Sequence, residues 1–282
     1  SQYTSRQDLD KLLKKLVKDA SKSDILKESD GEMFCELRAQ TAPGMGVAIA
    51  GHLSQRGIFK QEYYFPYVES SQVTSTADCS IQRHTERETF AGLLDEYRVG
   101  ISLIFYMENS MEYRLRLKNS QPVLPKSASL SALSIHGKIL LPVQKTPQQT
   151  EDRKKAASKR SRLIEAAKRG DEEAIETLTV EDIDLFSSVS RRVAREDIYS
   201  IVDTCFMPSG IECDQYSVIG NILSVDRRIN RITGEEIFLL GLECNDLLFT
   251  AAINAADLLG EPVPGRRFKG QVWIQGNVCF EA

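Results

Sequence analysis

The side chains that come closest to a metal-binding group are those of His84, Glu86 and Glu88. On a strand, alternate residues share one face, so these three could surround a divalent cation. On a helix each residue advances by about 100 degrees, and the same side chains would spread around the axis. Arg83 and Arg87 could then pair with the two acids at the surface, and the sequence favours this interpretation. We predict no metal and no other cofactor, with His84, Glu86 and Glu88 as the candidates if a metal binds.

Three acidic residues, Asp203, Glu212 and Asp214, lie close together before the C-terminal quarter of the chain. Carboxylates that line a cleft between two domains can act as general acids and bases. Acidic side chains also cap turns, and the sequence favours this structural role. A Ser–His–Asp triad depends on residues that meet in space, and the chain has no Gly-x-Ser-x-Gly motif to support one. The three acids are therefore the catalytic candidates only if the protein is an enzyme.

Basic and aromatic residues are interleaved near the C-terminus, where Arg266, Arg267 and Lys269 precede Trp273. Grooves that bind single-stranded nucleic acid combine such charges with rings that stack on the bases. However, residues 208–282 contain six basic and ten acidic side chains, which makes this region negative. A tryptophan on an alternating strand is also typical of a core. These four residues are the ligand-binding candidates, and nucleic acid is not the favoured partner.

The first part of the chain has the pattern of an α+β domain. Ser5 can cap an amphipathic helix with Asp8 in its first turn, where a carboxylate suits the helix dipole. Pro43-Gly44 and Arg56-Gly57 are typical of tight turns. They separate the strands of a predicted antiparallel meander, which are 32–40, 46–53 and 59–67.

Further elements are predicted between this meander and residue 146. The pattern indicates a helix around 84–96 and then a strand at 99–107 that is buried on both faces. The alternation of Glu112–Leu117 predicts an edge or half-buried strand. His136-Gly137 is typical of a two-residue hairpin turn, so we expect strands at 130–135 and 138–143.

The middle of the chain has an unusual distribution of charge. Residues 151–169 contain eight basic and three acidic side chains, whereas residues 170–186 contain seven acidic and no basic ones. Basic residues that end one helix and acids that open the next suit the helix dipoles, and Gly170 is well placed to separate the two. Thr179 is expected to cap a third helix, and a further helix is expected over 189–201.

The C-terminal quarter returns to strand patterns, which suggest a small barrel that could resemble an OB-fold. A turn-rich connection at 230–234 separates the first two of its strands. The predicted strands are 216–225, 236–243, 247–253 and 268–280.

Composition excludes several classes of protein. The chain is 41% apolar and 27% charged, which is ordinary for a globular protein and argues against disorder. A net charge of −4 gives no general attraction to nucleic acid or to an anionic membrane, and no apolar run could span a bilayer. The six cysteines lack C-x-x-C spacing and are expected to be reduced, mostly buried thiols in the cytosol.

Several phrases of the sequence resemble a bacterial family of uncharacterised proteins, catalogued as domain of unknown function 3881. They extend over nearly the whole chain and lie at 63–67, 98–106, 130–134, 170–176, 210–216 and 265–270. The resemblance implies a soluble protein of anaerobic Gram-positive bacteria. It brings no activity, cofactor or catalytic residue with it.

We therefore expect an α+β protein in three parts: an antiparallel β-rich domain (1–146), a charged helical insertion or linker (147–207) and a small β-barrel (208–282). No chemically specific motif accompanies this pattern, which favours a non-catalytic cytoplasmic binding or adaptor protein. Its partner would be another protein, bound through the helical insertion, and no membrane is involved. An enzyme with an acidic cleft between domains, and a barrel that binds single-stranded nucleic acid, remain as alternatives.

Overall fold

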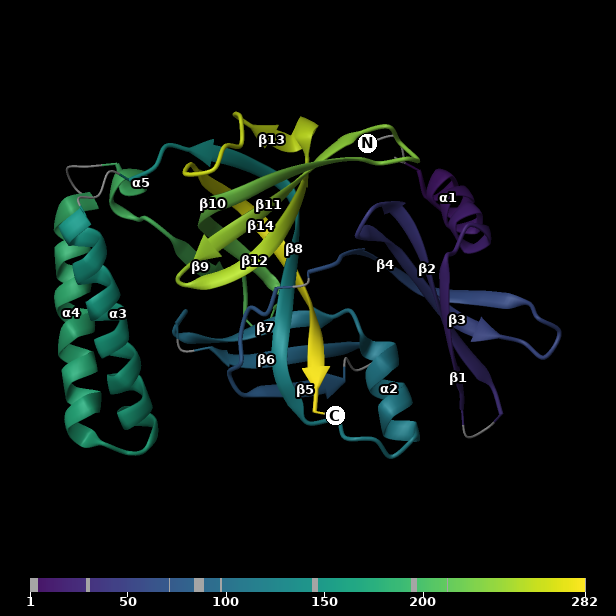
Figure 1. Ribbon diagram of the computed structural model, residues 1–282, viewed down its shortest axis with the longest axis horizontal. Helices are drawn as coiled ribbons and strands as arrows, with labels where there is room; N and C mark the ends of the chain where they lie inside the picture. The colour runs from purple at the N-terminus through teal and green to yellow at the C-terminus, as the bar shows by residue number, and fades with distance from the viewer. Residues whose placement is uncertain are drawn as a thin grey trace.

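The described part of the chain contains two β-sheets, a helical hairpin and several shorter helices, and the protein belongs to the predicted α+β class (Figure 1). The structure, a computed structural model, describes residues 5–28, 31–70, 72–83, 89–96, 98–143, 147–193, 197–211 and 213–281. Figure 1 shows the hairpin on one side of the larger sheet and the four-stranded sheet on the other. In the part of the chain that is described, no helix has the length and apolar character needed to span a membrane.

The four-stranded sheet confirms the predicted antiparallel meander and adds one strand before it. Helix α1 (Arg6–Lys18) covers this sheet, and Ser5 caps it by accepting a hydrogen bond from the Asp8 amide at 3.2 Å. Leu13 and Leu16 are buried between the helix and the strands, as the helical spacing of the leucines predicts. The strands are β1 (Lys22–Lys27), β2 (Met33–Ala42), β3 (Met45–Leu53) and β4 (Phe59–Val68).

The larger sheet contains ten strands among the described residues and holds the main apolar core. Five of its strands pair in a closed circuit, in which β8 bonds to both β12 and β14. Strands β7, β6 and β5 extend the sheet from β14. The strands are β5 (Cys79–Arg83), β6 (Phe90–Glu96), β7 (Ile101–Met107), β8 (Pro125–Leu140), β9 (Cys205–Pro208), β10 (Gln215–Ile229), β11 (Glu236–Cys244), β12 (Leu247–Asn254), β13 (Leu258–Leu259) and β14 (Arg267–Phe280).

The predicted hairpin turn at His136-Gly137 is wrong, because β8 continues through these residues. Gly137 pairs with Gly270 of β14 and with Leu258 of β13. A Cβ atom at position 137 would lie 2.4 Å from Cε2 of Phe268. The glycine therefore makes room for a neighbouring ring. In the sequence, a glycine needed for close packing cannot be distinguished from a glycine of a turn.

Two further predictions in this region need correction. The expected helix at 84–96 is strand β6 from Phe90 onward, with residues 84–88 outside the described part of the chain. The expected strand at Glu112–Leu117 lies within helix α2 (Ser110–Lys118). Alternating apolar residues fit α2 because the helix has apolar neighbours on two sides. Its Met111 packs against the four-stranded sheet, while Tyr113 packs on the core of the larger sheet.

The charged segment forms an antiparallel pair of long helices, α3 (Pro147–Lys168) and α4 (Glu172–Val193). The predicted break is confirmed at Gly170, which has a positive φ of 88° that favours glycine. The predicted third helix at Thr179 is wrong, because α4 continues through it and the Thr179 hydroxyl donates to the Ile175 carbonyl oxygen at 2.8 Å. Of the helix expected over 189–201, the structure has the end of α4 and the short α5 (Ile198–Ile201).

The predicted strands of the C-terminal quarter are confirmed as β10, β11, β12 and β14. Their partners include β8 and β7, which belong to the first half of the chain. The division at residues 146 and 207 stays a prediction. Strand pairing nevertheless joins segments from both sides of it within one sheet.

Candidate functional site

The acids predicted as catalytic candidates have structural contacts where the structure describes them. Asp214 accepts a hydrogen bond from the indole nitrogen of Trp273 at 2.6 Å, and its backbone carbonyl accepts the Ile274 amide. The backbone carbonyl of Asp203 faces Nη1 of Arg267 at 3.3 Å. Glu212 lies outside the described residues.

The basic and aromatic candidates serve the fold as well. Arg267 is buried and donates to four backbone carbonyl oxygens, those of Leu141, Tyr199, Val202 and Asp203. It thereby ties the segment that follows the helical hairpin to β14. Lys269 contacts the hydroxyl of Tyr199 and lies over its ring. Arg266 donates to the carbonyl oxygen of Glu261.

Trp273 lies between the two sheets. Its ring packs on Tyr106, with ring centroids 5.2 Å apart, and it joins the apolar cluster of the four-stranded sheet. Because one side of the ring is covered in this way and its nitrogen is bonded to Asp214, Trp273 contributes to the contact between the sheets. These neighbours leave it poorly placed for stacking on a base.

The proposed metal candidates His84, Glu86 and Glu88 lie outside the described residues. Among the residues that are described, no three His, Cys, Asp or Glu side chains are placed to hold a metal ion.

A charged cluster that was not predicted from the sequence lies between the two sheets. Arg38 on β2 donates through Nε to Oε1 of Glu36 at 2.9 Å and through Nη2 to the backbone carbonyl of Glu108 at 2.6 Å. The carboxylate of Glu108, which follows β7, accepts hydrogen bonds from Ser131 at 2.9 Å and Asn277 at 3.3 Å. Arg38 thus connects an acid of β2 with the backbone of the residue that follows β7 of the larger sheet.

Burial controls the protonation of this cluster. It raises the pKa of Glu108 to about 7, although the bonds from Ser131 and Asn277 and the charge of Arg38 act in the opposite direction. Burial also raises the pKa of Glu36, against the lowering effect of Arg38. Shifted pKa values of this kind occur at catalytic sites and in structural ion-pair networks alike. Glu108 is completely buried, so we interpret the cluster as a latch between the sheets.

One signal in the sequence points to this latch. Glu36 and Arg38 alternate within a strand of mostly apolar residues, which places both charges on one face of β2. A buried face tolerates charges only when they are paired. The sequence could therefore have indicated a buried pair, but not that Glu108 completes it.

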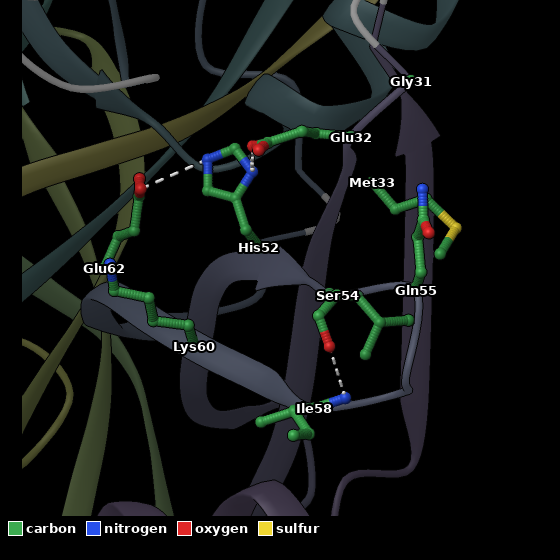
Figure 2. A pocket seen from close by; sticks show the side chains of 10 residues that line it. Gly31, Glu32, Met33, His52, Ser54, Gln55, Ile58, Lys60 and Glu62 are labelled. Carbon is green, nitrogen blue, oxygen red and sulfur yellow. Dashed lines mark hydrogen bonds and ion pairs between the residues drawn. The ribbon is translucent and has the colours of Figure 1, made fainter.

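A groove of about 770 Å³ lies at the end of the four-stranded sheet (Figure 2). Figure 2 shows the imidazole of His52 between two carboxylates, with Nδ1 3.2 Å from Glu32 and Nε2 3.2 Å from Glu62. The acids approach opposite sides of the ring, so the three groups do not converge on one point as metal ligands would. Through these two contacts His52 connects the residue before β2 with the edge strand β4.

The helical hairpin uses part of its divided charge internally. Lys159 pairs with Glu181 and Arg160 pairs with Asp182, both at 2.8 Å, across the contact between α3 and α4. At the far end of α3, Lys168 pairs with Asp95 of β6. Ala174, near the start of α4, is buried. The charge split therefore serves to pair the two helices in antiparallel order.

Aliphatic side chains remain exposed on the hairpin. Val180 is 52% exposed and Ile183 is 60% exposed, and both lie on α4 where all charged neighbours from 171 to 184 are acidic. A shallow groove of about 360 Å³ on α3 is lined by Lys155, Lys159, Arg162, Ser158 and Leu163. The hairpin thus offers one basic and one acidic helical surface, each with apolar side chains among the charges.

Comparison with known proteins places the chain in a family without giving it an activity. The model of the family described as "Domain of unknown function, E. rectale Gene description (DUF3881)" matches residues 1–276. No curated protein and no solved structure matches the chain. Since the match extends over nearly the whole sequence, the chain belongs to the DUF3881 family.

Proposed function

We propose that the protein is a non-catalytic binding or adaptor protein that meets another polypeptide through the α3–α4 hairpin. The observation that carries this proposal is the exposure of Val180 and Ile183 on the outer side of a hairpin whose helices are already paired by their own charges. Exposed aliphatic side chains flanked by charges are common where protein surfaces associate.

We further propose that the protein is cytoplasmic and that part of its larger sheet forms a small barrel. All six cysteines are free thiols, of which Cys35 and Cys244 are buried, and this suits a reducing cytoplasm. The family description names E. rectale, in agreement with a bacterial origin. The closed circuit of β8, β12, β11, β10 and β14 supports a small barrel with OB-like character, which would act as a rigid base for the hairpin.

The two alternative functions have less support. An enzyme would need accessible acids, but Asp214 is bonded to Trp273 and Glu108 is buried. A nucleic-acid groove would need free cations, but Arg267 is occupied by backbone carbonyls and Lys269 by Tyr199. These contacts favour a structural role for the residues that carried both alternatives.

Removal of the hairpin tests the proposal. Replacement of residues 151–186 by a short Gly/Ser linker should abolish capture of the partner from a cell lysate, while the sheets stay folded by circular dichroism. The double variant Val180→Asp/Ile183→Asp should weaken capture at least tenfold. Ile211→Asp is the matched control, because Ile211 is 96% exposed and lies outside the hairpin. Undiminished capture by the deletion variant would overturn the adaptor function.

A further inference from the structure

The basic groove of α3 lies on the side of the helix that is turned away from the sheets. Ile164 and Lys168 face a cavity shared with residues of the larger sheet, and Lys168 pairs with Asp95 there. Since each residue of a helix advances by about 100 degrees, Lys159 lies about 180 degrees from Lys168 and Lys155 about 140 degrees from it. The groove around Lys155 and Lys159 is therefore open to an external partner.

The adjacent helix α4 turns acids toward the same side of the hairpin. Glu181 of α4 pairs with Lys159, which lines the groove of α3. With Glu181 turned toward this groove, the spacing of about 100 degrees per residue places Glu173, Val180 and Asp184 on the same side of the hairpin. Asp184 is exposed, and Val180 is half exposed. One face of the hairpin thus has a basic groove on one helix and an acidic, partly apolar ridge on the other.

Such a face is complementary to itself. The ion pairs place residues 159–160 level with residues 181–182. Both helices rise by about 1.5 Å per residue in opposite directions, so Val180 lies level with about residue 161 and Asp184 with about residue 157. Both heights fall within the groove that extends from Lys155 to Leu163.

We propose that the partner of the hairpin is a second copy of this chain, bound face to face about a two-fold axis parallel to the helices. Such an axis keeps every residue at its own height and places α4 of one copy antiparallel to α3 of the other. Val180 then enters the partner copy's groove beside Leu163, and Asp184 lies between Lys155 and Lys159. Each contact is made twice, as an isologous interface requires, and the four helices form a bundle.

The size of the face suits a weak, reversible dimer. Two helices that are each about 33 Å long and about 10 Å wide present about 600 Å² per copy, near the lower end for specific association. Because opposite charges contribute much of the complementarity, we expect the affinity to fall as salt is added. This inference rests on the proposed function, since it names the partner of the same hairpin.

Sedimentation velocity of the full-length protein, from micromolar to hundreds of micromolar concentration, tests the inference. We expect a monomer–dimer equilibrium that shifts toward monomer between low and high salt. Asp184→Lys should weaken the dimer at least tenfold, and Lys155→Glu should do the same. The double variant Asp184→Lys/Lys155→Glu restores opposite charges across the interface and should regain most of the affinity. Recovery in the double variant shows that the single changes did not act by unfolding the hairpin.

Glu172→Lys is the matched control, because residue 172 lies about 120 degrees around α4 from Asp184 and carries the same change of charge. It should leave the dimer unchanged. A protein that stays monomeric at every concentration would overturn the inference, as would a dimer indifferent to both single variants. If a monomeric protein still captures another polypeptide through the hairpin, the adaptor function stands and only the second copy is excluded. If it captures none, both proposals fall.

Discussion

The guanidinium of Arg38 on β2 donates to the backbone carbonyl oxygen of Glu108 at 2.6 Å and so crosses from the four-stranded sheet to the larger one. Through its Nε atom the same side chain pairs with Glu36 of its own strand. The contact between the sheets therefore contains two buried carboxylates and one cation, in addition to the apolar residues around Trp273. The protonation of this cluster gives the fold a measurable dependence on pH.

Glu108→Gln should stabilise the protein at alkaline pH. The pKa of Glu108 is about 7 in the fold and about 4.5 in the unfolded chain, so the folded state binds the proton more tightly. The stability linked to this group is complete below the unfolded pKa and is lost as pH rises through 7. Glutamine stays neutral at every pH. The free energy of unfolding of the variant should therefore exceed that of the wild type by up to about 3 kcal/mol at pH 8, and the two should be similar near pH 4.5. Thermal unfolding at both pH values measures the difference.

Glu96→Gln is the matched control for this pH dependence. Burial opposes the charge of Glu96, but the hydrogen bonds from Arg98 and Ser75 outweigh it and lower its pKa. A group with a lowered folded pKa stabilises the fold above its unfolded pKa and loses this effect as pH falls. Glu96→Gln should therefore destabilise the protein at pH 8. If both glutamines shift the unfolding temperature in the same direction, our account of the latch is wrong.

Arg38→Met should destabilise the protein by about 3–5 kcal/mol at pH 8, because it leaves two buried carboxylates without their cation. The loss should be smaller at pH 5, where the raised pKa of about 7 keeps Glu108 largely protonated. Urea unfolding gives both values. The double variant Arg38→Met/Glu36→Gln removes one of the orphaned charges and should recover part of the stability. An equal loss of stability at both pH values would contradict the role of Arg38 as the partner of buried carboxylates.

Arg267→Lys should loosen the segment between the hairpin and β9. A lysine has one compact cationic group and cannot reach the carbonyl oxygens of Tyr199, Val202 and Leu141 with a planar fork. We expect a loss of about 3 kcal/mol and faster amide hydrogen exchange over residues 198–206. Arg266→Lys is the control, since Arg266 makes its bond at the surface. If amide hydrogen exchange over residues 198–206 is unchanged in Arg267→Lys, the hydrogen bonds of Arg267 do not hold this segment in place.

Gly137→Ala distinguishes the continuous strand from a hairpin turn. In the strand, the added Cβ atom meets the ring of Phe268 at 2.4 Å, and overpacking of this kind costs about 1–3 kcal/mol. Phe268→Leu in the same chain opens space and should reduce the cost of the alanine. Gly210→Ala, whose Cβ atom would lie 3.6 Å from Cys213 Sγ, should be nearly neutral. If Gly137→Ala leaves the free energy of unfolding unchanged, position 137 does not lie as close to the ring of Phe268 as described.

Elements with a strong local signal were predicted well. The leucines of α1, the turns that separate β2, β3 and β4, and the helix break at Gly170 are all decided by neighbours close in sequence. The secondary structure of short segments such as α2 was harder to predict. Met111 and Tyr113 pack toward different sheets, and no local pattern states that α2 will lie between two apolar surfaces.

By itself the sequence determined the α+β class, the periodicity of its longer elements and the opposite charges that pair α3 with α4. Only the tertiary structure decided which of these charges meet. Arg38 and Glu108 are 70 positions apart, and Asp214 and Trp273 are 59 positions apart. Residues so distant in the chain are brought together by strand pairing, and burial then sets their pKa values and their partners. The sequence alone indicated the charged hairpin as a candidate binding surface. Which side of the hairpin faces the solvent depends on how α3 packs on the larger sheet.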